Sequence, residues 1–305
     1  MTNDMVVSFP RMGNEYTEIF KELLEDLGFK VVIPPLKHDG LKFGIKNTPS
    51  MVCFPMKTSL ADMKVALDLG ANTIIMYDTK GLCRFRHYWK IQKQILNENG
   101  YNPEFIILTK KFFFQLKKAS KLSYFRTWKI IKKYWKIIKE IDKENKKFSN
   151  DKINIAIIGE IYCCLEPSVN YDVINKLKKY NVNPVFTITL TDFITEVFED
   201  TLKLNLTGKK EYLKKAKTYL NGPIGGHGER NIANTLWLCD KKIDGIIHLL
   251  PLVCMPDTMI EPIINKICKE NNVPLLRIPI DETSSEANLS TRIETFVELI
   301  RRKKE

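Results

Sequence analysis

Short apolar runs alternate with amphipathic stretches in two separate parts of this chain of 305 residues. The first part contains VVSFP, TIIMYD and EFIILT, separated by segments whose apolar residues have helical spacing. The second contains INIAIIGEIY, PVFTITL, IDGIIHLLPLVC and VPLLRIPID. Strands and helices that alternate in this way form parallel sheets with helices on both faces. The predicted fold class is therefore α/β, with two Rossmann-like doubly wound parallel-sheet domains, residues 1–110 and 152–305, and a basic helical connector, residues 111–151.

Most of the positive charge lies in the connector. Residues 110–147 hold fourteen Lys or Arg and three acidic residues, a local net charge of +11 within a total of +12. Arginine, the preferred residue for bidentate contacts to phosphates and bases, occurs only nine times against 39 lysines. We therefore expect that nucleic acid is not the partner of this protein.

Within the connector, apolar residues at four-three spacing predict one long helix. The stripe consists of Tyr124, Trp128, Ile131, Trp135 and Ile138. We expect this stripe to pack on the protein body, while Lys129, Lys132, Lys133 and Lys136 face solvent. Two other interpretations stay open, a helix that lies on a membrane surface and a helix that docks onto an acidic partner.

Three of the seven cysteines lie where a predicted strand gives way to a loop: Cys53 in MVCFPMK, Cys83 after TIIMYD, and Cys254 after IIHLLPLV. Binding loops of parallel sheets lie beyond the carboxyl ends of the strands, so two facing domains could bring these thiols together. Thiolates suit zinc or an iron-sulfur cluster, although a lone cysteine is commonly a core residue. Cys239 and Cys268 have helical spacing among apolar residues and are expected in the core. The role of the adjacent pair Cys163 and Cys164 stays open.

A glycine-rich turn and two acidic residues are further candidates. Gly225, Gly226, His227 and Gly228 precede a predicted helix, where exposed amides favour anions, although a plain helix connection fits equally well. No Walker motif occurs, so the sequence does not predict ATP binding. Glu160 and Glu166 follow a predicted strand, and each is a candidate acid or base or a capping carboxylate.

The sequence also bears on where the protein is found in the cell. No apolar stretch approaches the roughly 18 to 20 residues that a membrane-spanning helix needs, and polar residues follow Met1. We therefore expect a cytoplasmic protein. Its cysteines should be free or metal-bound, because disulfides are rare in a reducing compartment.

Several motifs together resemble the D-component family of 2-hydroxyacyl-CoA dehydratases and the related domain of large activase proteins. They are CFPMK at 53–57, GLCRF at 81–85, GEIYCCLEPSVN at 159–170, GGHGER at 225–230, CMPD at 254–257 and DETSSEANLSTRIE at 281–294. The likeness is carried by the order and spacing of the set over nearly the whole chain. Double-cubane reductases are similar more distantly.

The resemblance implies a 4Fe-4S cluster held by Cys53, Cys83 and Cys254 in an oxygen-sensitive, anaerobic protein. It also implies a partner ATPase, the activase, that passes low-potential electrons to the cluster. In the dehydratases the reduced site forms a ketyl radical from a 2-hydroxyacyl-CoA thioester, and the resemblance also allows a homologous subunit as a partner. The implied activity is a reductive or radical dehydration by a lyase or reductase. The alternative is a non-catalytic accessory or electron-relay subunit that docks on an acidic partner.

Three positions depart from the family pattern. Leu82 stands where the family usually has proline, Arg86 where it has glycine, and Thr283 where it has histidine. Arg86 could hydrogen-bond to cluster sulfur or close the entrance to the site. Together with the acidic and glycine-rich segments described above, this gives Glu160, Arg86 and His227 as candidate catalytic residues. The candidate cofactor-binding residues are Gly225, Gly226 and Gly228.

Overall fold

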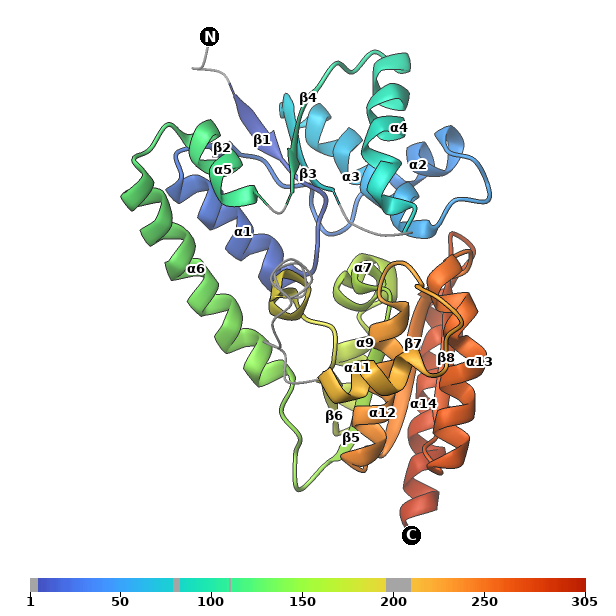
Figure 1. Ribbon diagram of the computed structural model, residues 1–305. Helices are drawn as coiled ribbons and strands as arrows, with labels where there is room; N and C mark the ends of the chain where they lie inside the picture. Colours follow the sequence, from blue (N-terminus) through green and yellow to red (C-terminus); the bar gives the residue numbers. More distant parts are fainter. Residues whose placement is uncertain (1–4, 79–82, 110, 196–209) are drawn as a thin grey trace. The chain divides into compact units, whose positions relative to one another are not determined.

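The computed structural model describes residues 5–78, 83–109, 111–195 and 210–305. The chain divides into two compact units, Met1–Glu140 and Ile141–Glu305, and each contains a sheet of four strands (Figure 1). All neighbouring strands in both sheets pair in parallel. The predicted α/β fold with two doubly wound parallel sheets is confirmed. The domain boundaries predicted at 110 and 151 stay a prediction.

The first unit has the strand order β2-β1-β3-β4. Its strands are β1 Val6–Ser8, β2 Lys30–Val31, β3 Thr73–Tyr77 and β4 Glu104–Leu108. Its helices are α1 Asn14–Asp26, α2 Leu41–Asn47, α3 Phe54–Asp68, α4 Phe85–Glu98, α5 Phe112–Ser120 and α6 Tyr124–Asn145, the last of which continues across the unit boundary. One core cluster joins the sheet to α1, α5 and α6, and another joins it to α3 and α4. Helices therefore cover both faces of this sheet.

The second unit has the strand order β6-β5-β7-β8. Its strands are β5 Ile153–Gly159, β6 Val182–Phe186, β7 Gly245–Pro251 and β8 Leu275–Ile280. Its helices are α7 Ile161–Leu165, α8 Pro167–Asn170, α9 Val173–Lys179, α11 Lys210–Lys217, α12 Gly228–Asp240, α13 Met255–Glu270 and α14 Glu286–Lys304. Every residue of β7 is buried, as expected for a central strand of a parallel sheet. The expected core cysteines, Cys239 and Cys268, lie in the cluster that packs α12 and α13 on this sheet.

The predicted apolar stripe of the connector is only partly correct. Ile138 is buried, but Tyr124 and Trp128 are 59% and 49% exposed, and the buried positions include Thr127 and Tyr134 instead. The rotation of α6 is set where it meets α1. There the Tyr134 hydroxyl donates to Asp26 Oδ2 over 2.9 Å, and Lys133 Nζ lies 2.9 Å from the same oxygen. This contact turns the first aromatic residues of α6 away from the core. The four predicted solvent-facing lysines are all exposed.

Candidate functional site

Cys53 is the N-cap of α3, and Pro55 follows inside the first turn. Its half-buried Sγ donates to the Tyr88 hydroxyl of α4 over 3.3 Å. The expectation that Cys53 ends a strand is wrong, because a turn precedes it. The physical reason is Pro55: its ring fixes φ for the first helical turn, where no amide hydrogen is needed, so the helix begins directly after Cys53. Burial raises the pKa of Tyr88, and the phenol therefore stays protonated beside the thiol.

Cys83 lies two residues before α4 and is half-buried. Its carbonyl accepts a hydrogen bond from the amide of Arg86 over 3.3 Å. The Arg86 side chain is 47% exposed, and its Nε lies 3.7 Å from Asp78 Oδ1, just beyond the end of β3. Leu82, one of the departures from the family pattern, lies outside the described residues. The geometry thus places Arg86 beside Cys83 in a solvent-accessible position.

Cys254 is the N-cap of α13, three residues after the end of β7. Pro256 follows inside the first turn, so Cys53 and Cys254 occupy the same position of the same Cys-x-Pro start of a helix. The Cys254 Sγ is buried and donates to Asp257 Oδ2 over 3.2 Å. Burial, followed by the nearby Asp257 carboxylate, raises the pKa of Cys254 well above its ordinary value. The metal-free chain therefore holds Cys254 as a thiol.

A buried polar group surrounds Asp257, and we call it the Asp257 cluster: Asp257, Asn231 and His248 with the backbone of Gly159. Asp257 Oδ1 accepts from Asn231 Nδ2 over 3.0 Å and lies 3.2 Å from His248 Nε2. Asn231 Nδ2 also donates to the Gly159 carbonyl over 3.0 Å. All three side chains are almost fully buried, and His248 Nδ1 has no hydrogen-bond partner among the described residues. The cluster ties β5, β7, α12 and α13 together directly beside Cys254.

Glu160 follows β5 and caps α7, where its Oε2 accepts from the Cys163 amide over 2.9 Å. Burial raises the pKa of Glu160 to about 7, and the negative charge of Asp257 acts in the same direction. Glu160 can therefore exchange a proton near neutral pH. Cys163 and Cys164 are both fully buried, and burial also raises the pKa of Cys164.

His227 is the N-cap of α12 and is half-buried. Burial lowers the pKa of His227 to about 4, so the imidazole is neutral at pH 7. The glycine turn before it closes on itself, because the Gly228 amide donates to the Gly225 carbonyl over 3.4 Å. Gly226 has a φ of 59°, in the left-handed region that favours glycine. The role of these glycines in binding a cofactor stays a prediction.

Glu160→Gln should flatten the pH dependence of stability between about pH 4.5 and 7. In this range the folded chain retains a proton on Glu160 that the unfolded chain releases, because burial raises the pKa from 4.5 to about 7. The stabilising effect of that proton is present below the unfolded pKa and is lost as the pH rises through the folded pKa. It amounts to at most about 3 kcal/mol, and less because Glu160 is partly exposed. Urea unfolding at several pH values measures it, and equal pH slopes for both proteins would refute it.

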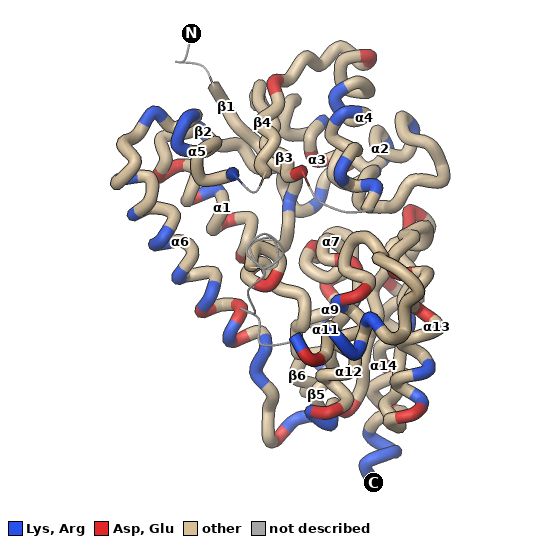
Figure 2. The backbone as a smooth tube through the Cα atoms, in the orientation of Figure 1, with Lys and Arg blue, Asp and Glu red and all other residues tan. Residues whose placement is uncertain are grey.

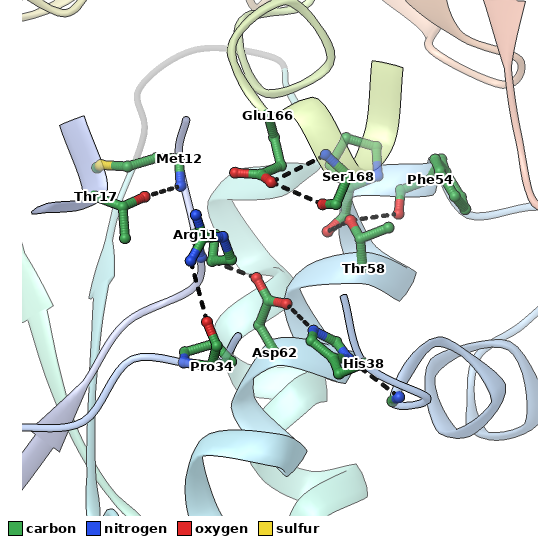
Figure 3. A network of polar contacts seen from close by, with 12 residues as sticks. Arg11, Met12, Thr17, Pro34, His38, Phe54, Thr58, Asp62, Glu166 and Ser168 are labelled. Carbon is green, nitrogen blue, oxygen red and sulfur yellow. Dashed lines mark hydrogen bonds and ion pairs between the residues drawn. The ribbon is translucent and has the colours of Figure 1, made fainter. Parts of the chain in front are cut away.

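A second buried polar group, in the first unit, was not found from the sequence. Asp62 of α3 accepts from the Arg11 amide over 2.9 Å and lies 2.8 Å from His38 Nε2, while Arg11 Nη1 donates to the Pro34 carbonyl over 3.1 Å (Figure 3). Arg11 and Asp62 are buried.

In the second unit, Glu166 accepts hydrogen bonds from the Ser168 amide and hydroxyl and caps α8 (Figure 3). This is the capping role that the sequence analysis considered for Glu166.

Comparison with known proteins places the chain. Residues 104–300 match the family of the 2-hydroxyglutaryl-CoA dehydratase D-component. The chain belongs to this family. A search of curated proteins gave no match. The predicted family resemblance is confirmed, and the protein is a 2-hydroxyacyl-CoA dehydratase-like subunit.

The matched range of the dehydratase family includes Cys254, Glu160, the Asp257 cluster and the glycine turn, whereas Cys53, Cys83 and Arg86 lie before it. Among the described residues, no group of three or more His, Cys, Asp and Glu side chains is arranged to hold a metal ion. Within the described ranges, every helix is too short or too polar to span a bilayer. A metal or cluster site at Cys53, Cys83 and Cys254 is therefore a proposal.

Proposed function

We propose that this dehydratase-like subunit binds a 4Fe-4S cluster through Cys53, Cys83 and Cys254. We further propose that it receives low-potential electrons from an ATP-hydrolysing activase and takes part in the reductive dehydration of a 2-hydroxyacyl-CoA. The observation that carries the proposal is the shared Cys-x-Pro helix start at Cys53 and Cys254, one in each unit. Family membership supports the reaction class.

The donor residues fit an iron-sulfur cluster chemically. Each of the three cysteines lies at or just before the first turn of a helix, where the partial positive charge of the amides stabilises a thiolate. Coordination by iron would displace the proton that Asp257 helps to retain on Cys254. The Tyr88 hydroxyl could then donate to the Cys53 sulfur, a type of contact that tunes cluster potential. When bound, the cluster would supply one-electron reduction, with one coordination position left without a cysteine.

Three other side chains have roles that their own chemistry supports. Glu160, with its pKa near neutrality, is suited to take or return a proton at its carboxylate. His227 is neutral at pH 7 and can accept a hydrogen bond or a proton. Arg86 is a cation beside Cys83, where it could orient an anionic substrate group or hydrogen-bond to sulfur. Family membership supports the proposed substrate class.

Anaerobic reconstitution tests the cluster. The wild-type chain should bind about four iron and four sulfide ions. Each of Cys53→Ser, Cys83→Ser and Cys254→Ser should lower the bound iron severalfold, because serine is a poor ligand for a cluster. Cys239→Ser and Cys268→Ser are matched controls in the core of the second unit and should retain the iron. Wild-type protein without iron, or iron unchanged in all three variants, would exclude the proposed site.

An assay of acyl-CoA dehydration distinguishes a catalytic subunit from a non-catalytic accessory subunit. The reconstituted chain would be mixed with an activase, ATP, a reductant and a panel of 2-hydroxyacyl-CoA thioesters. Formation of the unsaturated acyl-CoA, lost in Cys254→Ser, would support catalysis. A cluster that is reduced by the activase but turns over no thioester, alone or with a homologous subunit, would identify an electron-relay subunit.

A further inference from the structure

Four large aromatic side chains are exposed around the corner between α5 and α6. Phe114, Tyr124, Phe125 and Trp128 are 61%, 59%, 74% and 49% exposed. Single exposed apolar residues are ordinary, but a cluster of large ones marks a surface that meets another body. The sequence pattern had assigned two of these residues, Tyr124 and Trp128, to the core.

Contacts link these side chains in two neighbouring groups along α5 and α6. The rings of Phe125 and Trp128 stack with centroids 6.4 Å apart. Lys117 Nζ lies 4.2 Å from the centroid of the Tyr124 ring, and Lys132 Nζ lies 4.7 Å from that of Trp128. Phe114 precedes Lys117 by three residues and so shares its face of α5. We call these six residues the aromatic-lysine patch.

The patch lies in a strongly cationic segment. Residues 110–139 contain ten lysines and one arginine but no aspartate or glutamate. Basic residues recur along α5 and α6 (Figure 2). Lys133 is paired with Asp26 of α1. Lys132 of the patch is exposed, and the exposed Lys129 adds its charge beside the patch. The surface therefore fits an anionic occupant that also accepts aromatic rings.

The type of cation indicates which occupant fits best. Protein interfaces share the aromatic residues of this patch but are depleted of lysine, and arginine is the preferred reader of phosphates and bases in nucleic acids. Lysine combined with Phe, Tyr and Trp is typical of segments that lie on anionic membranes, where the rings sit among the headgroups and lysine stems reach the lipid phosphates. We propose that the aromatic-lysine patch binds the surface of an anionic phospholipid bilayer, with Phe125 and Trp128 inserted at headgroup depth. This attachment is independent of the proposed cluster and dehydration.

Co-sedimentation of the full chain with vesicles tests the proposal. Binding to phosphatidylcholine vesicles that contain phosphatidylglycerol should be strong at about 0.05 M salt and should fall steeply by about 0.5 M. Phe125→Ser with Trp128→Ser should weaken binding about tenfold or more, because two large apolar side chains no longer leave water. Lys129→Gln with Lys132→Gln should weaken it about fivefold per lysine, which corresponds to about 1 kcal/mol each.

Matched controls lie elsewhere on the surface. Leu69→Ser with Leu299→Ser replaces two other apolar residues, 54% and 52% exposed. Lys214→Gln with Lys215→Gln removes two exposed lysines of α11. Both control pairs should bind vesicles as the wild type does, and circular dichroism would verify that all variants are folded. No binding to anionic vesicles at low salt, or equal binding by the aromatic variant, would overturn the proposal. So would a complex with polyglutamate or single-stranded DNA that forms through the same residues while vesicles do not bind.

Discussion

Gly159→Ala should destabilise the second unit by about 4 kcal/mol, a sum of backbone strain and steric overlap. Gly159 has a φ of 138°, and a Cβ built on it would lie 1.7 Å from the Leu249 carbonyl oxygen of β7. The same oxygen accepts from the Glu160 amide over 3.1 Å. Alanine would force β5 and β7 apart at the point where Asn231 also bonds Gly159. Urea unfolding followed by circular dichroism measures the loss.

Gly222→Ala is the matched control for this substitution. A Cβ on Gly222 would meet nothing within 4 Å, and this glycine is exposed. Its unfolding free energy should stay within about 0.5 kcal/mol of the wild-type value. If Gly159→Ala were as stable as Gly222→Ala, the close approach of β5 and β7 would be disproved. A stable Gly159→Ala protein would also show that the contact between Asn231 and Gly159 is not needed for the stability of the second unit.

Asp257→Ala should cost about 3 kcal/mol, because it removes the acceptor that satisfies several buried donors at once. His248 Nε2 would lose its contact at 3.2 Å, and the Cys254 thiol would lose its acceptor. Asn231 Nδ2 would retain only the Gly159 carbonyl. No water can easily replace the carboxylate, since Asp257 is 2% exposed and His248 is fully buried. Thermal unfolding of the metal-free chain provides the measurement.

Two further variants make this result specific. Asp257→Asn retains the side-chain shape and one oxygen acceptor, so it should lose less stability than Asp257→Ala. Asp151→Ala removes an exposed carboxylate from the same unit and should change the unfolding free energy by no more than about 0.5 kcal/mol. An Asp257→Ala protein that unfolds like Asp151→Ala would show that the buried cluster contributes nothing to stability.

The strands of the second unit were the most predictable part of the fold. The run INIAIIG became β5 and GIIHLLP became β7, because central strands of a parallel sheet are buried on both faces and read as continuous apolar runs. The short run before Cys53 misled the prediction. Its apolar residues suggested a strand, whereas Pro55 marked the start of a helix. At this position the proline predicts the local structure better than the apolar residues do, because it favours the first turn of a helix.

The candidate site was predictable only in its parts. The helix starts at Cys53 and Cys254 could be inferred from the proline two residues after each cysteine. The environment of Cys254 could not, because Asp257, Asn231 and His248 come from two helices and a strand. The spacing of these residues along the chain does not indicate that they form one buried cluster. Of these three residues, only Asp257 lies in one of the motifs that resemble the dehydratase family.

The sequence by itself determined the alternation of strands and helices and the family, because backbone periodicity and motif order are local properties of the chain. The tertiary structure alone decided that Asp257 accepts from Cys254 and that Gly159 approaches β7. It also decided that Tyr124 and Trp128 face outward, since Asp26 of α1 holds Tyr134 and so sets the rotation of α6. These contacts depend on how one element packs on another. The helical spacing of apolar residues does not determine which of them will be buried against a neighbouring element.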